Sequence, residues 1–157
     1  ANGLLINKEY SMDSNNQLKM SVSRLHGEGN SGKAYLDEKD AFSPTTYWYL
    51  NKDGHLKNRF DDNCLTTSGI EKSDLYMSKC SDSPNQIWKW DNRSNRLVLK
   101  DDSNQSSKVN CIGLSGKKFD ENTALTTESK EDDKYKRYLQ LKKCDSSVKP
   151  DEVWSFT

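Results

Sequence analysis

Apolar residues in this chain come in short runs that alternate with polar residues. Leu97-Val98-Leu99 and Leu139-Gln140-Leu141 are examples, and segments rich in Asn, Asp, Gly and Ser lie between such runs. Successive side chains of a strand point to opposite faces, so alternation over a few residues predicts a strand. No stretch of about twelve residues keeps the apolar spacing of an amphipathic helix. The pattern therefore predicts an all-β chain of many short strands.

One local pattern recurs along the chain. Trp48, Trp88 and Trp154 each follow a short polar segment, and a cysteine stands several residues before the second and third of them. Trp48 and Trp88 are about forty residues apart, a period at which internal similarity indicates a repeat architecture. The third copy is longer, and we expect its extra residues in the polar stretch between Gly113 and Tyr138. The repeat predicts a single domain over residues 1–157, with three pseudo-repeats at about 5–50, 51–92 and 93–157.

Three copies of about four strands each predict a closed barrel of pseudo-threefold symmetry, capped by hairpins. Closure removes the exposed edges that an open polar sheet would have to protect. The shift of forty residues that superimposes Trp48 on Trp88 places Arg24 and Asp40 where the second copy has Cys64 and Cys80. An ion pair between these charges would add at most about 1 kcal/mol if it were exposed.

The four cysteines of the chain are Cys64, Cys80, Cys111 and Cys144. None belongs to a Cys-x-x-Cys pair, and both histidines are distant in the sequence, so the zinc-binding templates do not match. An even number of widely spaced cysteines favours two disulfides and an oxidising compartment over the alternative of four free thiols. Four cysteines allow three pairings, and the repeat selects Cys64–Cys80 and Cys111–Cys144. We expect a secreted protein without a bound metal or cofactor.

Composition and charge narrow the class of protein. Hydrophobic residues make up 32% of the chain and the mean hydropathy is −1.03, values that approach those of disordered chains. Disorder also requires a high net charge, whereas 24 basic and 24 acidic residues cancel here and aromatic residues reach 10%. The charges are spread evenly, which argues against nucleic-acid binding, and no apolar run is long enough to cross a bilayer. The start at Ala1 leads us to expect a processed protein or a module of a larger one.

The order Cys-Leu, then alternating apolar residues up to a second cysteine, then Gln-x-Trp, resembles the ricin B-like (R-type) lectins. The segment from Cys64 to Trp88 carries the resemblance best, and the outer two copies are degenerate. The resemblance implies a β-trefoil whose core contains Trp48, Trp88 and Trp154. It also implies a non-catalytic domain that does not insert into membranes. Such a domain would bind galactose, GalNAc or related glycans of glycoproteins or glycolipids.

Sugar binding in this family uses a carboxylate, an aromatic ring and an amide at fixed positions. The Asp comes two residues after the first Cys, the aromatic residue two before the second Cys, and the Asn directly before the Gln. The second copy, which keeps the Asn, has Thr66, Ser78, Asn85 and Gln86. The third copy, in which a Glu replaces the Gln, has Gly113, Lys142, Asp151 and Glu152. The first copy has His26, Glu38 and Thr45.

No copy is complete, so we expect a variant site, centred on the second copy. Tyr76 precedes Ser78 by two residues, and by strand alternation it should share the same face. The candidate sugar-binding residues are Asn85, Gln86, Tyr76, Thr66, Asp62 and Asp82. The alternative is that the glycan site has moved or has been lost.

Two other functions stay open for a trefoil of this kind. A soybean Kunitz-type protease inhibitor is also a β-trefoil with two disulfides, although the repeated Trp unit argues against it. A protein-binding trefoil without a sugar site is the second alternative. Enzymatic activity is not expected, because neither His26 nor His55 has a readable nucleophile with a supporting carboxylate. By analogy with the family, we expect a targeting module of a secreted toxin or of another secreted protein, joined to further domains.

Overall fold

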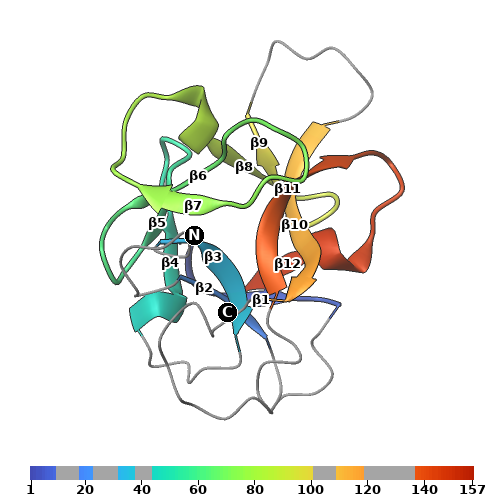
Figure 1. The fold of residues 1–157 in the computed structure, drawn as a ribbon, viewed down its shortest axis with the longest axis horizontal. Coiled ribbons are helices and arrows are strands. Elements are labelled where there is room, and N and C mark those ends of the chain that lie inside the picture. Colours follow the sequence, from blue (N-terminus) through green and yellow to red (C-terminus); the bar gives the residue numbers. More distant parts are fainter. Residues whose placement is uncertain (10–17, 23–31, 38–43, 101–108, 119–136) are drawn as a thin grey trace.

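Within the residues that the structure describes, twelve strands form one curled antiparallel sheet (Figure 1). The computed structural model describes residues 1–9, 18–22, 32–37, 44–100, 109–118 and 137–157. In chain order the strands are β1 (Asn2–Asn7), β2 (Lys19–Val22), β3 (Ala34–Asp37), β4 (Tyr47–Leu50), β5 (Leu56–Asn58), β6 (Cys64–Thr66), β7 (Tyr76–Ser78), β8 (Trp88–Asp91), β9 (Arg96–Leu99), β10 (Val109–Lys118), β11 (Arg137–Cys144) and β12 (Trp154–Phe156). The all-β prediction is confirmed.

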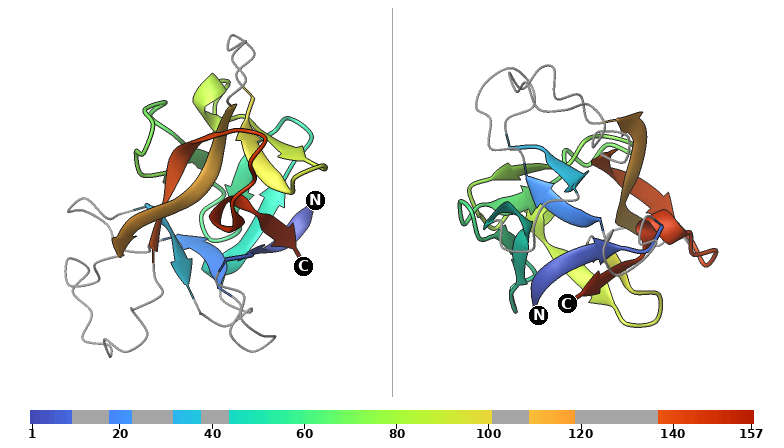
Figure 2. Two further views of the ribbon diagram at one scale, coloured as in Figure 1. Left: turned by 90° about the vertical axis from the view of Figure 1, so that its right-hand side faces the viewer. Right: turned by 90° about the horizontal axis from the view of Figure 1, so that it is seen from below.

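The strands pair in the same antiparallel scheme along the chain. β2–β3, β6–β7 and β10–β11 are hairpins, and β4–β5 and β8–β9 link one group of four strands to the next. β12 returns to pair with β1, where Asn7 faces Trp154, so the two ends of the chain lie side by side (Figure 2). β12 lies off the path of the other eleven strands, and it covers β1, which also pairs with β2 and β4.

Three buried tryptophans hold equivalent places in the core. Each indole Nε1 donates a hydrogen bond to a strand carbonyl, and the pairs are Trp48 with Met20 at 2.8 Å, Trp88 with Leu65 at 2.9 Å and Trp154 with Ile112 at 3.2 Å. The three side chains are at most 2% exposed, and aliphatic side chains of the strands surround them. A buried indole N–H needs a hydrogen-bond partner, so these contacts fix both the depth and the orientation of each ring.

The tryptophan contacts correct the predicted alignment of the first copy. They place Lys19, at the start of β2, in the position of Cys64 at the start of β6. The prediction that Arg24 stands there is wrong. Trp48 and Met20 are 28 residues apart, whereas Trp88 and Leu65 are 23 apart, so the first hairpin is longer than the second. A constant shift of forty residues therefore misaligns the two copies. Four residues that the shift assigned to the first copy lie outside the described part of the chain: Arg24, His26, Glu38 and Asp40.

Both predicted disulfides are present, and they are Cys64–Cys80 and Cys111–Cys144. The linked residues are 16 apart in the second copy and 33 apart in the third, so much of the extra length lies between the third-copy cysteines. There β10 and β11 extend their hairpin until Lys118 faces Arg137. Residues 119–136, which include most of the predicted insertion, lie outside the described residues.

Single 3₁₀ turns precede the strands that carry the core tryptophans. They are η1 (Pro44–Thr46), η2 (Pro84–Gln86) and η5 (Pro150–Glu152). Each begins with proline, whose fixed φ suits the first position of a helical turn. The later residues of each turn are therefore held beside the barrel wall. Among the described residues, no helix has both the length and the apolar content needed to cross a membrane.

Candidate functional site

Each 3₁₀ turn packs against a strand of its own copy, which creates three equivalent places for a site. The second residue of the turn is Thr45, Asn85 or Asp151. We define the first-copy site as Ser21, Asp37, Thr45 and Thr46. The second-copy site is Thr66, Ser78, Asn85 and Gln86, and the third-copy site is Gly113, Lys142, Asp151 and Glu152.

Gln86 joins the parts of the second-copy site and is only 2% exposed. Its Nε2 lies 2.8 Å from Ser78 Oγ, 2.9 Å from the Lys79 carbonyl and 3.1 Å from Thr66 Oγ1, and donates to these acceptors. Its Oε1 accepts a hydrogen bond from the Ser81 N–H at 2.8 Å. The amide is thus occupied by protein groups, and Gln86 supports the site from beneath rather than facing solvent.

The hydroxyl of Thr66 is also engaged. Thr66 Oγ1 donates to the Cys64 carbonyl at 2.9 Å, lies 2.9 Å from Ser78 Oγ and accepts from Gln86. The residue is 6% exposed. Thr66 stands where the family has an Asp, but it does not present the free acceptor that a sugar hydroxyl needs.

Asn85 and Tyr76 keep free side-chain groups. The Asn85 backbone is fixed, because its N–H donates to Ser83 Oγ at 3.2 Å and its carbonyl accepts from the Thr67 N–H at 3.1 Å. Tyr76 faces Thr66 across the β6–β7 ladder and is 37% exposed. Within the described part of the chain, neither the Asn85 amide nor the Tyr76 hydroxyl has a hydrogen-bond partner.

The neighbouring surface is partly apolar. Tyr76 and Ser78 lie on the outer face of β7 and the residue between them faces the core, as the alternation predicts. In the loop after β6, Gly69 adopts a φ of 86°, and a Cβ there would lie 3.9 Å from Asn85 Oδ1. Ile70 follows and is 68% exposed. The second-copy site therefore offers one amide, one aromatic ring and one aliphatic side chain to a ligand.

The remaining predicted residues lie apart from this surface. Asp62 is exposed after β5, and its carbonyl oxygen lies 3.6 Å from Cys80 Sγ. Asp82 is exposed in the segment between β7 and η2. No contact within the described residues brings either carboxylate to Asn85 or Tyr76. The structure therefore brings together Thr66, Tyr76, Asn85 and Gln86, and leaves Asp62 and Asp82 outside the group.

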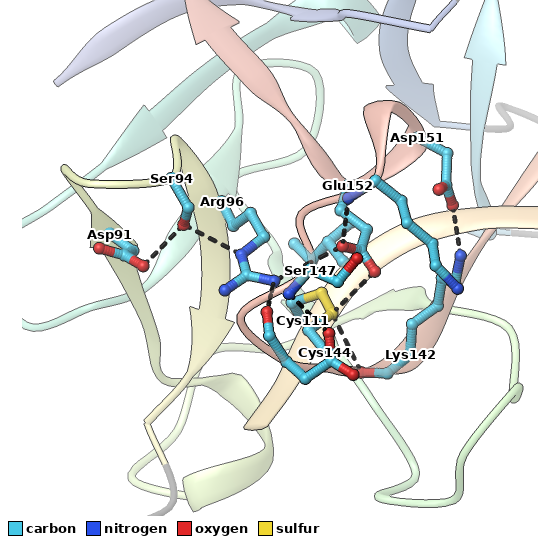
Figure 3. Close-up of polar contacts among 12 residues, drawn as sticks. Asp91, Ser94, Arg96, Cys111, Lys142, Cys144, Ser147, Asp151 and Glu152 are labelled. Atoms are coloured by element: carbon cyan, nitrogen blue, oxygen red, sulfur yellow. Dashed lines mark hydrogen bonds and ion pairs between the residues drawn. A yellow bond between two sulfur atoms is a disulfide. The ribbon is translucent and has the colours of Figure 1, made fainter. Parts of the chain in front are cut away.

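An ion pair closes the third-copy site (Figure 3). Lys142 Nζ donates to Asp151 Oδ2 at 2.6 Å, and the Leu114 N–H donates to the same oxygen at 3.2 Å. The aliphatic stem of Lys142 crosses Gly113, because a Cβ at this glycine would overlap Lys142 Cδ. The chain thus fills, with its own side chain, the place equivalent to the open surface around Asn85.

Asn7, at the end of β1, and Glu9, which follows β1, add polar groups next to this ion pair. Burial raises the pKa of Glu9, the Asp151 carboxylate raises it further, and Lys142 and Arg137 lower it. The Glu9 N–H donates to Asn7 Oδ1 at 3.0 Å, and Asn7 Nδ2 donates to the Asp151 carbonyl at 3.1 Å. Asn7 therefore anchors η5 to β1, a role that its sequence context did not reveal.

Glu152 replaces the Gln of the Gln-x-Trp unit and is 2% exposed. Its Oε1 lies 3.5 Å from Arg96 Nη1 and accepts from the Lys149 N–H at 3.1 Å (Figure 3). Arg96, 6% exposed, also donates to the Asp145 carbonyl at 2.8 Å and to Ser94 Oγ at 3.0 Å. A buried carboxylate needs such a partner because water no longer stabilises its charge. Sequence reasoning missed Arg96, although a Glu at a core Gln position calls for a nearby cation.

The first-copy site is shut off from solvent. Ser21 Oγ donates to Thr45 Oγ1 at 2.8 Å, and the Tyr35 hydroxyl donates to Asp37 Oδ2 at 2.7 Å. All four residues are at most 3% exposed. Ser21 and Asp37 hold the positions that the constant shift had assigned to His26 and Glu38, and their side chains are buried in hydrogen bonds with other residues of the chain.

The described residues contain one group of potential metal ligands, formed by Cys111, Cys144 and Glu152. The two sulfurs are joined in a disulfide, so neither is a thiolate, the form that binds a metal. His55, the histidine within the described residues, has Nε2 2.8 Å from the Ser81 carbonyl. The chemistry that these sites offer is hydrogen bonding and contact with an aromatic ring.

Comparison with known proteins places these observations in a family. Residues 15–136 match the model of the ricin-type beta-trefoil lectin domain. No curated protein sequence matches the chain.

Several solved structures share the fold. The beta-trefoil lectin of the Vibrio vulnificus hemolysin/cytolysin, solved with N-acetyl-D-lactosamine, is 18% identical with a TM-score of 0.62; the match covers 100% of this chain and 93% of that one. The C-half of an earthworm R-type lectin, in complex with GalNAc, is 12% identical with a TM-score of 0.61, covering 98% and 95%. A non-toxic homologue of type II RIPs from bitter gourd (Momordica charantia), in complex with α-methyl-D-galactoside, is 13% identical with a TM-score of 0.61, covering 99% and 47%. The predicted β-trefoil is confirmed.

Proposed function

Because the chain belongs to the ricin-type β-trefoil lectin family, we propose that it binds glycans without catalysis, through the second-copy site. The observation that carries the proposal is the contrast among the three equivalent sites. Buried hydrogen bonds occupy the first, and the Lys142–Asp151 ion pair fills the third. At the second, the Asn85 amide and the Tyr76 ring remain available beside the exposed Ile70.

The chemistry of this surface suits a sugar. An amide both donates and accepts, so Asn85 can pair with two neighbouring hydroxyl groups of a pyranose. Tyr76 can stack on the apolar face of the ring, and Ile70 can extend that contact. Gln86 and Thr66, held by their own hydrogen bonds, keep Asn85 and β7 in place. The binding groups are therefore few and rigidly supported.

We infer a galactose- or GalNAc-type ligand, presented on glycoproteins or glycolipids. The support is the family and the sugars bound by the similar structures, which are N-acetyl-D-lactosamine, GalNAc and a galactoside. One shallow site of this kind binds with a Kd of about 1 mM. Effective adhesion then requires several copies or further domains on one parent protein.

A secreted targeting module is the setting we propose for this binding. Two disulfides favour an oxidising compartment. The similar lectin of the Vibrio vulnificus hemolysin/cytolysin is part of a toxin, which supports the same arrangement here. The domain would then deliver a toxin, or another secreted partner domain, to glycans on a cell surface.

A glycan array with the chain and its variants tests the proposal. We expect binding to terminal galactose or GalNAc that Asn85→Ala and Tyr76→Ala each reduce by about tenfold or more. Asn2→Ala and Tyr49→Ala remove the same groups elsewhere and should leave binding unchanged, because Asn2 is exposed on β1 and Tyr49 lies on β4. Inhibition of a serine protease without binding to any glycan would favour the Kunitz-type alternative and overturn the lectin proposal.

A further inference from the structure

A hollow lined by none of the residues of the three equivalent sites lies next to the third-copy site, because its lining residue Arg96 pairs with Glu152. It has a volume of about 480 Å³ and opens between the β8–β9 hairpin, the start of β10 and the segment that follows β11. The volume falls within the range of small-molecule sites. Its lining residues are Lys89, Trp90, Asp91, Asn92, Arg93, Arg96, Val98, Val109, Cys144, Asp145 and Ser146.

Two valines make the hollow partly apolar. Val98 is half-buried on β9, where it faces Lys89 on one side and Cys111 on the other. Val109, at the start of β10, is 36% exposed. At the equivalent place of the preceding copy, Lys57 faces Tyr49 and Cys64 in the same register. An apolar residue at this place therefore distinguishes the β8–β9 hairpin from the preceding β4–β5 hairpin.

Protein donors already hold the acidic groups of the hollow. Asp91 Oδ2 accepts from Ser94 Oγ at 2.6 Å, and Asp91 Oδ1 accepts from the Arg93 N–H at 3.0 Å (Figure 3). Asp145 Oδ1 accepts from the Ser147 N–H at 2.8 Å. These contacts fix both carboxylates in place and occupy part of their accepting capacity.

Two cationic side chains of the hollow are uncommitted. Lys89 and Arg93 are exposed, and neither side chain has a hydrogen bond or an ion pair within the described part of the chain. Arg96, by contrast, is buried beside Glu152. Among the described residues, the charged side chains of the hollow without a protein partner are therefore Lys89 and Arg93, and both are donors.

We propose that this hollow is a second saccharide site, which binds the carboxylate or sulfate of an acidic sugar. Lys89 and Arg93 hold the anionic group, since a guanidinium pairs with a carboxylate or sulfate through two parallel hydrogen bonds. Val98 and Val109 contact the apolar face of the sugar ring. The inference rests on the proposed lectin function, but it uses none of the residues of the second-copy site.

Titrations of the ¹⁵N-labelled chain followed by NMR test the site directly. The probes are 3′-sialyllactose, lactose 3′-sulfate and neutral lactose, and the first two separate a carboxylate ligand from a sulfate ligand. We expect at least one acidic probe to shift the amide signals of residues 89–98, 109 and 145–146. Arg93→Gln and Lys89→Gln should each weaken that binding by about tenfold. Lys52→Gln removes one charge at the exposed β4–β5 turn and should have no effect.

The outcomes separate this inference from the lectin function itself. Binding of an acidic probe that Arg93→Gln weakens and Asn85→Ala leaves intact supports the second site. Acidic and neutral probes that bind alike, through Asn85 only, overturn the second site and retain the lectin proposal. Acidic binding that Arg93→Gln and Lys89→Gln leave unchanged also overturns it. Absence of binding to every probe contradicts both proposals.

Discussion

Lys142 and Asp151 form an ion pair, with 2.6 Å between Nζ and Oδ2, at the place where the side-chain amide of Asn85 in the second copy has no partner among the described residues. Both side chains are largely shielded from solvent, with exposures of 22% and 13%. The pair lies over Gly113, a residue whose missing side chain makes room for the lysine stem. A family position for sugar binding has thus become an internal contact of the barrel.

Gly113→Ala is expected to destabilise the chain, because the added methyl group must displace Lys142 from Asp151. We expect a loss of about 1 kcal/mol in the free energy of unfolding, measured with urea. The same substitution in a Lys142→Ala background should cost much less, since the clash and the ion pair are both gone. Lys143→Ala, at the exposed neighbouring position, is the control. Equal losses in both backgrounds would show that the stem does not lie over Gly113.

The buried pair of Arg96 and Glu152 predicts strong coupling in a double-mutant cycle. Arg96→Gln leaves the Glu152 carboxylate buried without a cation and should cost about 3 kcal/mol at neutral pH. Adding Glu152→Gln restores the residue found at Gln86 in the second copy and should recover much of that loss. Arg59→Gln, an exposed arginine, should change the stability little. Additive losses in the cycle would mean that the two charges do not depend on each other.

The two disulfides are expected to contribute unequally to stability. In the loop-entropy model, replacing Cys111 and Cys144 by Ala costs about 4 kcal/mol, because that bond closes the longer loop. Replacing Cys64 and Cys80 by Ala costs about 3 kcal/mol. Urea unfolding under oxidising conditions measures both values, with the oxidised wild-type chain as the reference. The reverse order would contradict the loop argument.

The lowered pKa of Asp91 predicts that part of the free energy of unfolding depends on pH. The Ser94 hydroxyl lowers the pKa of Asp91, and the backbone N–H of Arg93 lowers it further. A carboxyl group whose pKa is lower in the folded than in the unfolded state stabilises the fold at any pH above its unfolded-state pKa. This stabilisation is lost as the pH falls through its folded-state pKa. Asp91→Asn should therefore reduce the free energy of unfolding by about 0.5 kcal/mol at pH 7 and should have no effect at a pH below the folded-state pKa of Asp91.

Urea titrations at pH 7 and at strongly acidic pH check this dependence. Asp53→Asn is the matched control, because Asp53 is exposed in the β4–β5 turn and should show no such difference. A loss on Asp91→Asn that persists unchanged at acidic pH would assign the effect to packing and not to charge.

The sequence by itself determined the all-β class, the three core tryptophans and both disulfides. These features follow from short-range alternation and from the spacing of distinctive residues, which survive changes in loop length. Four of the six predicted sugar-binding residues were also predictable as a group, because Thr66, Tyr76, Asn85 and Gln86 lie at fixed offsets from the cysteines and the tryptophan.

Only the tertiary structure decided which of these groups remain available. Hairpin length fixed the register of the first copy, so Lys19 replaced Arg24 in the position of Cys64. Hydrogen-bond saturation withdrew Thr66 and Gln86 from solvent. The pairing of Glu152 with Arg96 and the hydrogen bond from the Leu114 N–H to Asp151 join positions that are distant in the sequence. Such contacts depend on where each hairpin ends and on which donors remain unpaired, and both are properties of the folded barrel.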